Sequence, residues 1–171
     1  EIQRLQDALG ITTIYVTHDQ EEALAISDRV AVMQDGRAEQ IATPRSVYHR
    51  PATRFVAEFV GDNNVFSGTV VGHSADDTVQ VDLGGTILEI VAGENHHVTG
   101  GDTVVFCVRP EAFGVDVSKN QLVTAVTSTE FLGWTTRVHL GWQGRELLIR
   151  TDADIEGTVA VGFDPADAHV V

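Results

Sequence analysis

Positive charge is scarce in this sequence. Its 171 residues include 11 lysines and arginines against 25 aspartates and glutamates, which leaves a formal net charge of −14 at pH 7. Lys119 is the only lysine. An acidic surface repels phosphate backbones and anionic headgroups, so we expect neither nucleic acid nor an anionic membrane surface as a partner.

Cysteine and long apolar runs are also lacking. Cys107 is the only cysteine, which excludes an internal disulfide, and its place within TVVFCV predicts a small buried side chain. Such cysteine usage is compatible with a reducing cytoplasm. No apolar run approaches the roughly 18 residues of a membrane span, and no signal peptide is recognisable. We therefore expect a cytoplasmic chain of one domain or two small ones.

The stretch IYVTHDQEEA (residues 14–23) places a histidine directly after an apolar run. Residues 11–16 are mainly β-branched, with little alternation, which predicts a strand covered on both faces, as in a parallel sheet. Asp19 and Glu22 have the spacing of a capping box, so a helix should begin there. His18 would then lie at the carboxyl end of a strand, where open α/β sheets bind ligands. The alternative is a histidine that bonds only a neighbouring backbone group.

The chain up to about residue 61 continues as mixed helix and strand. Asp35-Gly36, flanked by residues 30–34 and 37–42, is typical of a two-residue hairpin turn. Thr43 and Pro44 have the residue types of an N-cap and a first helical position. A further helix is expected before Gly61, with one apolar face that belongs to the core, formed by Phe55, Val56, Phe59 and Val60.

From residue 63 the composition changes to short valine-rich runs separated by glycine turns, which is typical of a small all-β unit. This part contains an internal repeat. Residues 103–110 (TVVFCVRP) and 158–165 (TVAVGFDP) align at an offset of 55 residues and share the final proline. Copies of this size are marginal alone, so we expect two similar barrels that pack as a pair.

Other candidate constellations are weaker. His96 and His97 are adjacent, so on a strand they would point to opposite faces, and no zinc-like spacing of ligands surrounds them. We expect no metal site there. Trp134 and Trp142 are expected to cover or fill the core rather than to stack on bases or sugars.

Two further groups of polar residues are candidate sites. Arg109 and Glu111 are interpreted as a local structural pair, with partner docking as the alternative. Ser/His/Asp catalysis has no support, because Ser128, His139 and Asp152 lack the sequence context of an activated nucleophile.

The residues quoted above resemble one family over essentially the whole chain. YVTHDQEEALAISDRVAVMQDGRAEQIATPRSVYHRPATRFVAEFVGDNNVFSG (residues 15–68) is similar to the C-terminal part of ATP-hydrolysing subunits of ABC importers, in the branch for maltose, polyamine and ferric iron. VRPEAFGV (residues 108–115) resembles a segment of their regulatory extension, TOBE. The resemblance implies an α/β remnant of a P-loop ATPase domain over residues 1–62. Over residues 63–171 it implies a TOBE domain of two OB-like barrels.

The same resemblance implies a role for His18. It matches the switch histidine, which contacts the γ-phosphate of ATP and helps to position the attacking water, while Asp19 and Glu22 hold the loop as caps. Since the sequence has no G-x-x-x-x-G-K-[ST] motif, we expect a fragment that is inactive alone. ATP and Mg²⁺ would be the cofactors of the parent protein, with no cofactor in this chain apart from the contact of His18.

Two functions therefore remain open at the level of sequence. The first is the regulatory and dimerisation end of an importer ATPase, which would form a homodimer and act with membrane subunits at the cytoplasmic face of the cell membrane. The alternative is a small-oxyanion sensor, since OB-like pairs of this kind bind molybdate in related proteins. The net charge and the single lysine, Lys119, argue against the sensor.

Overall fold

The structure, a computed structural model, describes residues 4, 8–74, 77–93, 98–115 and 117–171. The adjacent histidines considered above as metal ligands, His96 and His97, lie outside the described residues. Contacts divide the chain into two compact units, Glu1–Gly61 and Asp62–Val171.

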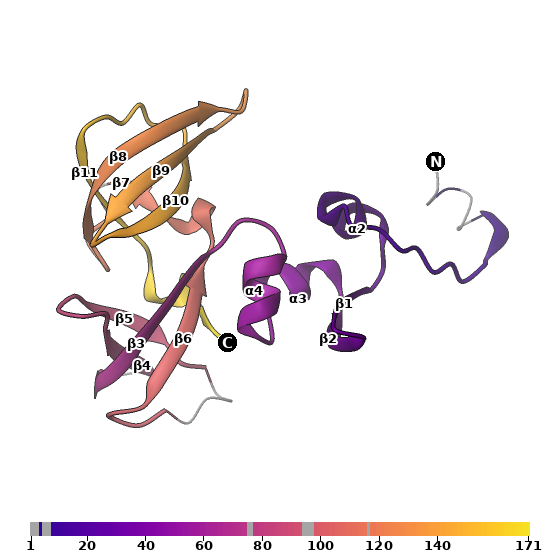
Figure 1. Cartoon of the computed structure of the whole chain (residues 1–171), viewed down its shortest axis with the longest axis horizontal. Helices are drawn as coiled ribbons and strands as arrows, with labels where there is room; N and C mark the ends of the chain where they lie inside the picture. Colours follow the sequence, from indigo (N-terminus) through magenta and orange to yellow (C-terminus); the bar gives the residue numbers. More distant parts are fainter. Residues whose placement is uncertain (1–3, 5–7, 75–76, 94–97, 116) are drawn as a thin grey trace. The chain divides into compact units, whose positions relative to one another are not determined.

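The first unit is built from short elements around one hairpin (Figure 1). They are α2 (Gln20–Ile26), β1 (Val30–Gln34), β2 (Arg37–Ala42), α3 (Pro44–His49) and α4 (Arg54–Phe59). Strands β1 and β2 pair antiparallel. Asp35 and Gly36 both have positive φ, 48° and 78°, which is the backbone of the predicted hairpin turn.

Side-chain caps begin the helices α2, α3 and α4. The Asp19 carboxylate accepts the Glu22 backbone N–H, and the Thr43 hydroxyl accepts that of Ser46, with Pro44 in the first turn. Both predicted caps are thus confirmed. Thr53 caps α4 in the same way. Each cap satisfies one of the backbone N–H groups that have no partner in the first turn of its helix.

The core of the first unit is small and valine-rich. Val32, Val47, Val56 and Val60 are buried, and Leu24 and Phe55 pack against them. The predicted apolar face of α4 is therefore confirmed for its two valines. Phe59 is 45% exposed and stacks on Phe55 with ring centroids 5.4 Å apart, so its assignment to the core was wrong.

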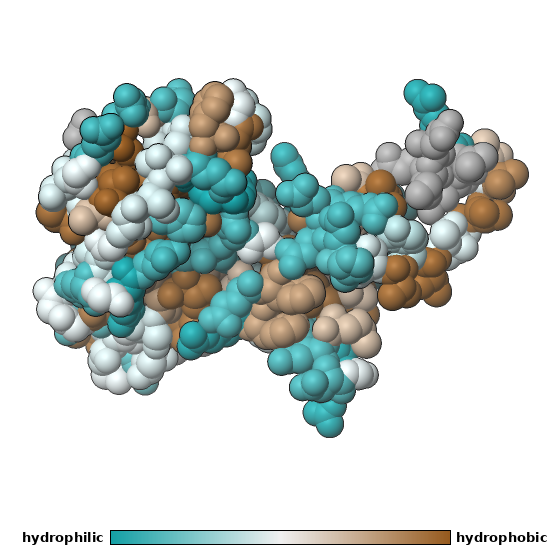
Figure 2. Space-filling view, turned by 45° about the horizontal axis from the view of Figure 1, so that its top comes forward, coloured by the Kyte–Doolittle hydropathy of each residue, from teal (hydrophilic) through white to brown (hydrophobic). Residues whose placement is uncertain are grey.

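The expected strand over residues 11–16 is absent, which corrects the sequence analysis. The segment has no regular secondary structure, and Ile14 and Val16 are 89% and 90% exposed. Hydrophobic residues accordingly lie at the surface in this part of the chain (Figure 2). A strand needs backbone partners, and no described residue pairs with this segment. The α/β sheet expected for the first unit is therefore not formed; its only sheet is the β1–β2 hairpin in the described part of the chain.

The second unit consists of two curled, five-stranded antiparallel sheets (Figure 1). The first has the order β12-β6-β3-β4-β5 and the second the order β7-β11-β8-β9-β10. Short 3₁₀ turns η1 (Pro110–Ala112) and η2 (Pro165–Asp167) follow β6 and β11. The strands are β3 (Asn64–His73), β4 (Thr78–Asp82), β5 (Ile87–Val91), β6 (Thr103–Val108), β7 (Gly114–Val115), β8 (Leu122–Phe131), β9 (Thr136–Trp142), β10 (Arg145–Thr151), β11 (Thr158–Gly162) and β12 (Ala168–Val170).

The two sheets repeat one strand order, which confirms the internal repeat. Pro110 and Pro165 occupy equivalent places, since each begins the 3₁₀ turn after the fourth strand of its copy. The final strand of each copy, however, joins the sheet of the other: β7 pairs with β11, and β12 pairs with β6. The sequence did not predict this exchange.

Two asparagines link the copies reciprocally. Asn64, in the first copy, donates to the Leu148 carbonyl at 2.7 Å and accepts the Leu148 N–H at 2.8 Å. Asn120, in the second copy, forms the same pair of bonds with Glu89, both at 2.7 Å. Each side-chain amide therefore imitates a backbone partner for a strand of the other copy.

One hydrophobic core serves both sheets. Phe66 stacks on Phe106 and meets Trp142, from the other sheet, edge-on at 6.3 Å. Trp142 is 5% exposed and so belongs to the core as predicted, whereas Trp134 is 79% exposed. Cys107 is buried, also as predicted, and burial raises the pKa of its thiol.

Gly68→Ala should test the close packing of β3 against β4. A Cβ at this position would lie 2.6 Å from the Asp82 carbonyl oxygen, so the backbone would have to shift. We expect a loss of about 1–3 kcal/mol in the free energy of unfolding, measured by urea denaturation. Gly100→Ala is the matched control, because nothing lies within 4 Å of its added methyl. Equal stability of the two variants would contradict the packing.

Candidate functional site

His18 lies in a bend immediately before the first turn of α2, with its side chain exposed. Asp19 forms the N-cap directly after it, with extended backbone angles (φ −84°, ψ 109°). The imidazole is therefore presented to solvent from a position whose backbone is set by the cap of the next residue.

Hydrogen bonds hold the residues on both sides of His18. The Tyr15 hydroxyl and the Thr17 hydroxyl both donate to one carboxylate oxygen of Glu22, at 2.8 and 3.3 Å. The Asp19 N–H donates to the Thr17 hydroxyl oxygen at 2.9 Å, and the Glu22 N–H donates to Asp19 at 3.0 Å. Asp19 and Glu22 thus hold the loop, the role that the resemblance implied for them.

Tyr15 is part of this network although the sequence analysis did not single it out. Its hydrogen bond to the Glu22 carboxylate raises the pKa of the phenol, because ionisation would remove the donated proton and place two negative charges together. The only signal in the sequence was the spacing of a tyrosine seven residues before an acidic residue of a capped helix.

The arrangement around His18 suits recognition of an anionic group by a hydrogen bond. A neutral imidazole donates from one ring nitrogen, and a fixed backbone reduces the freedom that His18 loses when it binds a ligand. Among the described residues of the first unit, Asp19 and Glu22 are the other candidates of the sequence analysis in this turn. Its contact with a phosphate stays a prediction.

The weaker candidates belong to the second unit, whereas His18 belongs to the first. Ser128 and His139 are cross-strand neighbours on β8 and β9, and His139 Nδ1 lies 2.7 Å from Glu146 Oε1. Asp152 follows β10 and forms none of these contacts among the described residues. No group of three potential metal ligands occurs in the described ranges.

Three arginines converge on Asp62, and the sequence analysis missed this cluster. Arg109, 7% exposed, donates to the Asp62 carbonyl oxygen at 2.8 Å. Arg137 and Arg150 contact the Asp62 carboxylate at 3.2 and 2.9 Å. Arg137 and Arg150 lie directly opposite each other on β9 and β10, where like charges repel. The Asp62 carboxylate offsets that repulsion.

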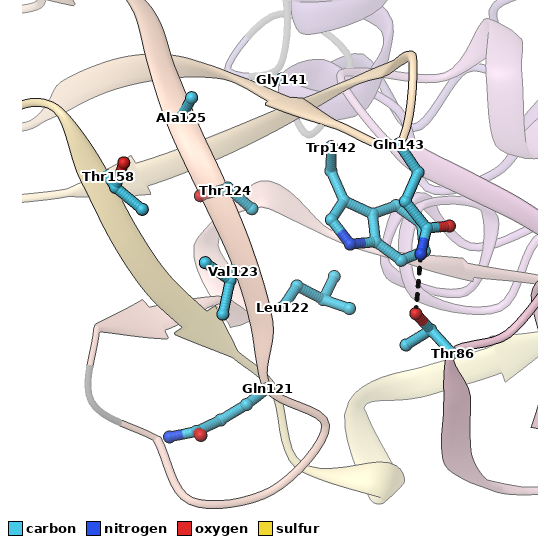
Figure 3. A pocket seen from close by; sticks show the side chains of 10 residues that line it. All are labelled: Thr86, Gln121, Leu122, Val123, Thr124, Ala125, Gly141, Trp142, Gln143 and Thr158. Atoms are coloured by element: carbon cyan, nitrogen blue, oxygen red, sulfur yellow. Dashed lines mark hydrogen bonds between the residues drawn. The ribbon is translucent and has the colours of Figure 1, made fainter.

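The second unit also carries an open pocket of about 500 Å³. Figure 3 shows it between β8 and the end of β9, with the Gln143 side chain donating to the Thr86 hydroxyl at 2.8 Å. Its lining is neutral: Thr86, Gln121, Leu122, Val123, Thr124, Ala125, Gly141, Trp142, Gln143 and Thr158. Lys119 instead forms an ion pair with Asp164 at 2.8 Å. The pocket therefore has no cationic side chain for an oxyanion.

Asp62→Asn should weaken the second unit, because it leaves Arg137 and Arg150 opposed without the carboxylate between them. All three side chains are partly exposed, so we expect a loss of only about 1 kcal/mol in the free energy of unfolding, larger at low salt. Urea denaturation at two salt concentrations measures it. Asp152→Asn, an exposed carboxylate of the same unit, is the control. A loss that is the same for both variants, or independent of salt, would contradict the role of Asp62.

The fold of this chain is similar to that of a known structure. The structure of the cytoplasmic molybdate-binding protein ModG matches 63% of the chain and 94% of its own, with a TM-score of 0.54 and 20% identity. That likeness concerns the fold alone. No helix among the described residues is long and apolar enough to cross a membrane.

Comparisons of sequence identify similar proteins. A model of the TOBE domain matches residues 106–171. The spermidine/putrescine import ATP-binding protein PotA of Rubrobacter xylanophilus is 44% identical over 80% of this chain and 37% of its own length. PotA of Mesorhizobium japonicum is 36% identical over 98% of this chain and 45% of its own length. The Fe(3+) ions import ATP-binding protein FbpC of Fusobacterium nucleatum is 37% identical over 95% of this chain and 43% of its own length. The chain spans less than half the length of these relatives. It is similar to a part of the ATP-binding subunits of ABC importers, and its residues 106–171 match the TOBE domain.

Proposed function

We propose that this chain is the C-terminal, regulatory portion of an ATP-hydrolysing importer subunit, and that His18 is its contribution to the catalytic site. The observation that carries the proposal is the exposed histidine on a capped, hydrogen-bonded turn, in a chain related to importer ATP-binding subunits. The relatives are named for polyamines and for ferric iron, so the inference reaches solute import as a class.

His18 acts in this proposal by positioning. Its imidazole N–H donates a hydrogen bond to a γ-phosphate oxygen of ATP and helps to orient the water that attacks the phosphorus. Phosphoryl transfer depends mainly on such positioning and on stabilisation of charge. ATP and Mg²⁺ bind chiefly to other parts of the parent protein, since the sequence here has no phosphate-binding loop. Thr17, Asp19 and Glu22 keep the backbone around His18 in place.

The proposal also accounts for the exposed segment before His18. Residues 11–16 have the β-branched composition of a buried strand but no backbone partner among the described residues. In the parent protein, neighbouring strands of an ATPase sheet would pair with them and bury Ile14 and Val16. Residues 1–62 would then be the end of the ATPase domain, and residues 63–171 the TOBE regulatory domain.

The partners follow from this assignment. We propose a homodimer in which the second unit of one chain contacts the second unit of the other. We also propose association with the importer's membrane subunits, through the ATPase domain, at the cytoplasmic face of the membrane. The acidic composition supports a chain that reaches the membrane through protein partners rather than through anionic lipid. It also argues against nucleic acid as a partner.

The alternative, a small-oxyanion sensor, is less well supported. It is suggested by the likeness of fold to a molybdate-binding protein. The neutral lining of the pocket and the ion pair of Lys119 with Asp164 both argue against it. A thermal shift with molybdate or tungstate, at concentrations where sulfate has no effect, would favour the sensor instead.

His18→Ala in the full-length subunit should reduce ATP hydrolysis by about 10²–10³-fold and leave nucleotide binding intact, because one transition-state hydrogen bond is lost. Steady-state hydrolysis and nucleotide titration measure the two effects. His73→Ala, at the exposed end of β3, is the matched control. Loss of binding with hydrolysis retained would refute the role.

The chain alone should show no turnover above background, and turnover that His18→Ala abolishes would refute that expectation.

The chain should form dimers, because exposed Ile14 and Val16 favour association, and each large apolar side chain left in water costs about 1.5–3 kcal/mol relative to burial. Light scattering across a dilution series tests this. A mass that stays near 18.5 kDa at high concentration would contradict the dimer. The double variant Ile14→Ser, Val16→Ser distinguishes the two routes: if it still dimerises, the β units form the contact.

A further inference from the structure

Gln20 lies two residues after His18 and forms a hydrogen bond across 41 residues of sequence. Its side-chain oxygen Oε1 accepts the backbone N–H of Gly61 at 2.7 Å. Gln20 is the first residue of α2, so its backbone follows directly from the Asp19 cap. The bond therefore joins the turn that carries His18 to the last residue of the first unit.

The packing of α2 explains why Gln20 reaches Gly61. Leu24 lies one helical turn after Gln20, on the same face, and packs against the core that contains Val56 and Val60 of the α4 region. The Val60 N–H closes α4 by donating to the Val56 carbonyl. Gly61 then adopts a positive φ of 65°, and its N–H is left for the Gln20 side chain. The packing of Leu24 thus brings the start of α2 close to the end of α4, and the hydrogen bond from Gly61 to Gln20 fixes how they align.

We propose that Gln20 is a positioning residue that holds the turn carrying His18 against Gly61, at the end of the first unit. The tie between Gln20 and Gly61 stands on the contacts above. Its consequence for ATP hydrolysis rests on the proposed function.

Amide hydrogen exchange of this chain, followed by NMR, tests the tie. Gln20→Leu removes the acceptor, so the Gly61 N–H should exchange about 5- to 10-fold faster. Gln20→Glu keeps an acceptor oxygen at the same place, and an acidic residue suits a helix N-terminus, so protection should return. Gln34→Leu, at the end of β1, is the control and should leave Gly61 unchanged. Unchanged exchange in Gln20→Leu, or no recovery in Gln20→Glu, would overturn the proposal.

A second measurement tests the effect on His18. Gln20→Leu should shift the imidazole resonances of His18, whereas Gln34→Leu should leave them in place. If Gly61 exchange responds to Gln20→Leu while the His18 resonances do not, Gln20 holds only Gly61 and the positioning role is wrong.

In the full-length subunit, Gln20→Leu should lower kcat several-fold with KM for ATP unchanged, and Gln20→Glu should restore kcat. An unchanged kcat in Gln20→Leu, with His18→Ala strongly impaired, would overturn the positioning role. If His18→Ala itself retains full hydrolysis, the proposed function fails, and the exchange and resonance measurements still decide the tie between Gln20 and Gly61. The two failures are therefore distinguishable.

Discussion

The exchange of final strands between the two β copies is the constraint on which the second unit depends. Strand β7 completes the sheet of the second copy and β12 that of the first, so neither sheet is whole without the other copy. Asn64 and Asn120 reinforce the exchange, because each bonds a strand of the opposite copy. The result is one shared core around Phe66 and Trp142. Two copies of about 55 residues, each marginally stable alone, thereby form one domain.

The same interlocking places the Asp62 cluster. Arg109 follows β6 of the first copy, while Arg137 and Arg150 come from β9 and β10 of the second. Only the packed pair brings these guanidinium groups to one carboxylate. Asp62, the first residue of the second unit, is therefore held by both copies.

Local signals predicted local structure well. Asp35-Gly36 predicted the hairpin and Thr43-Pro44 the start of α3, because turn and cap geometry depends on neighbouring residues only. Asp19 predicted the cap that sets the backbone after His18. The composition of residues 11–16 predicted a strand that did not form, since strand pairing needs partners that propensity does not supply.

The sequence by itself determined the caps, the hairpin, the repeat and the resemblance to importer ATP-binding subunits. Tertiary structure alone decided which strand completes which sheet, that Trp142 is buried while Trp134 is exposed, and that three arginines meet at Asp62. It also decided that Gln20 reaches Gly61. These contacts join residues 41 to 88 positions apart, and such pairings depend on how whole elements pack rather than on any signal within one element.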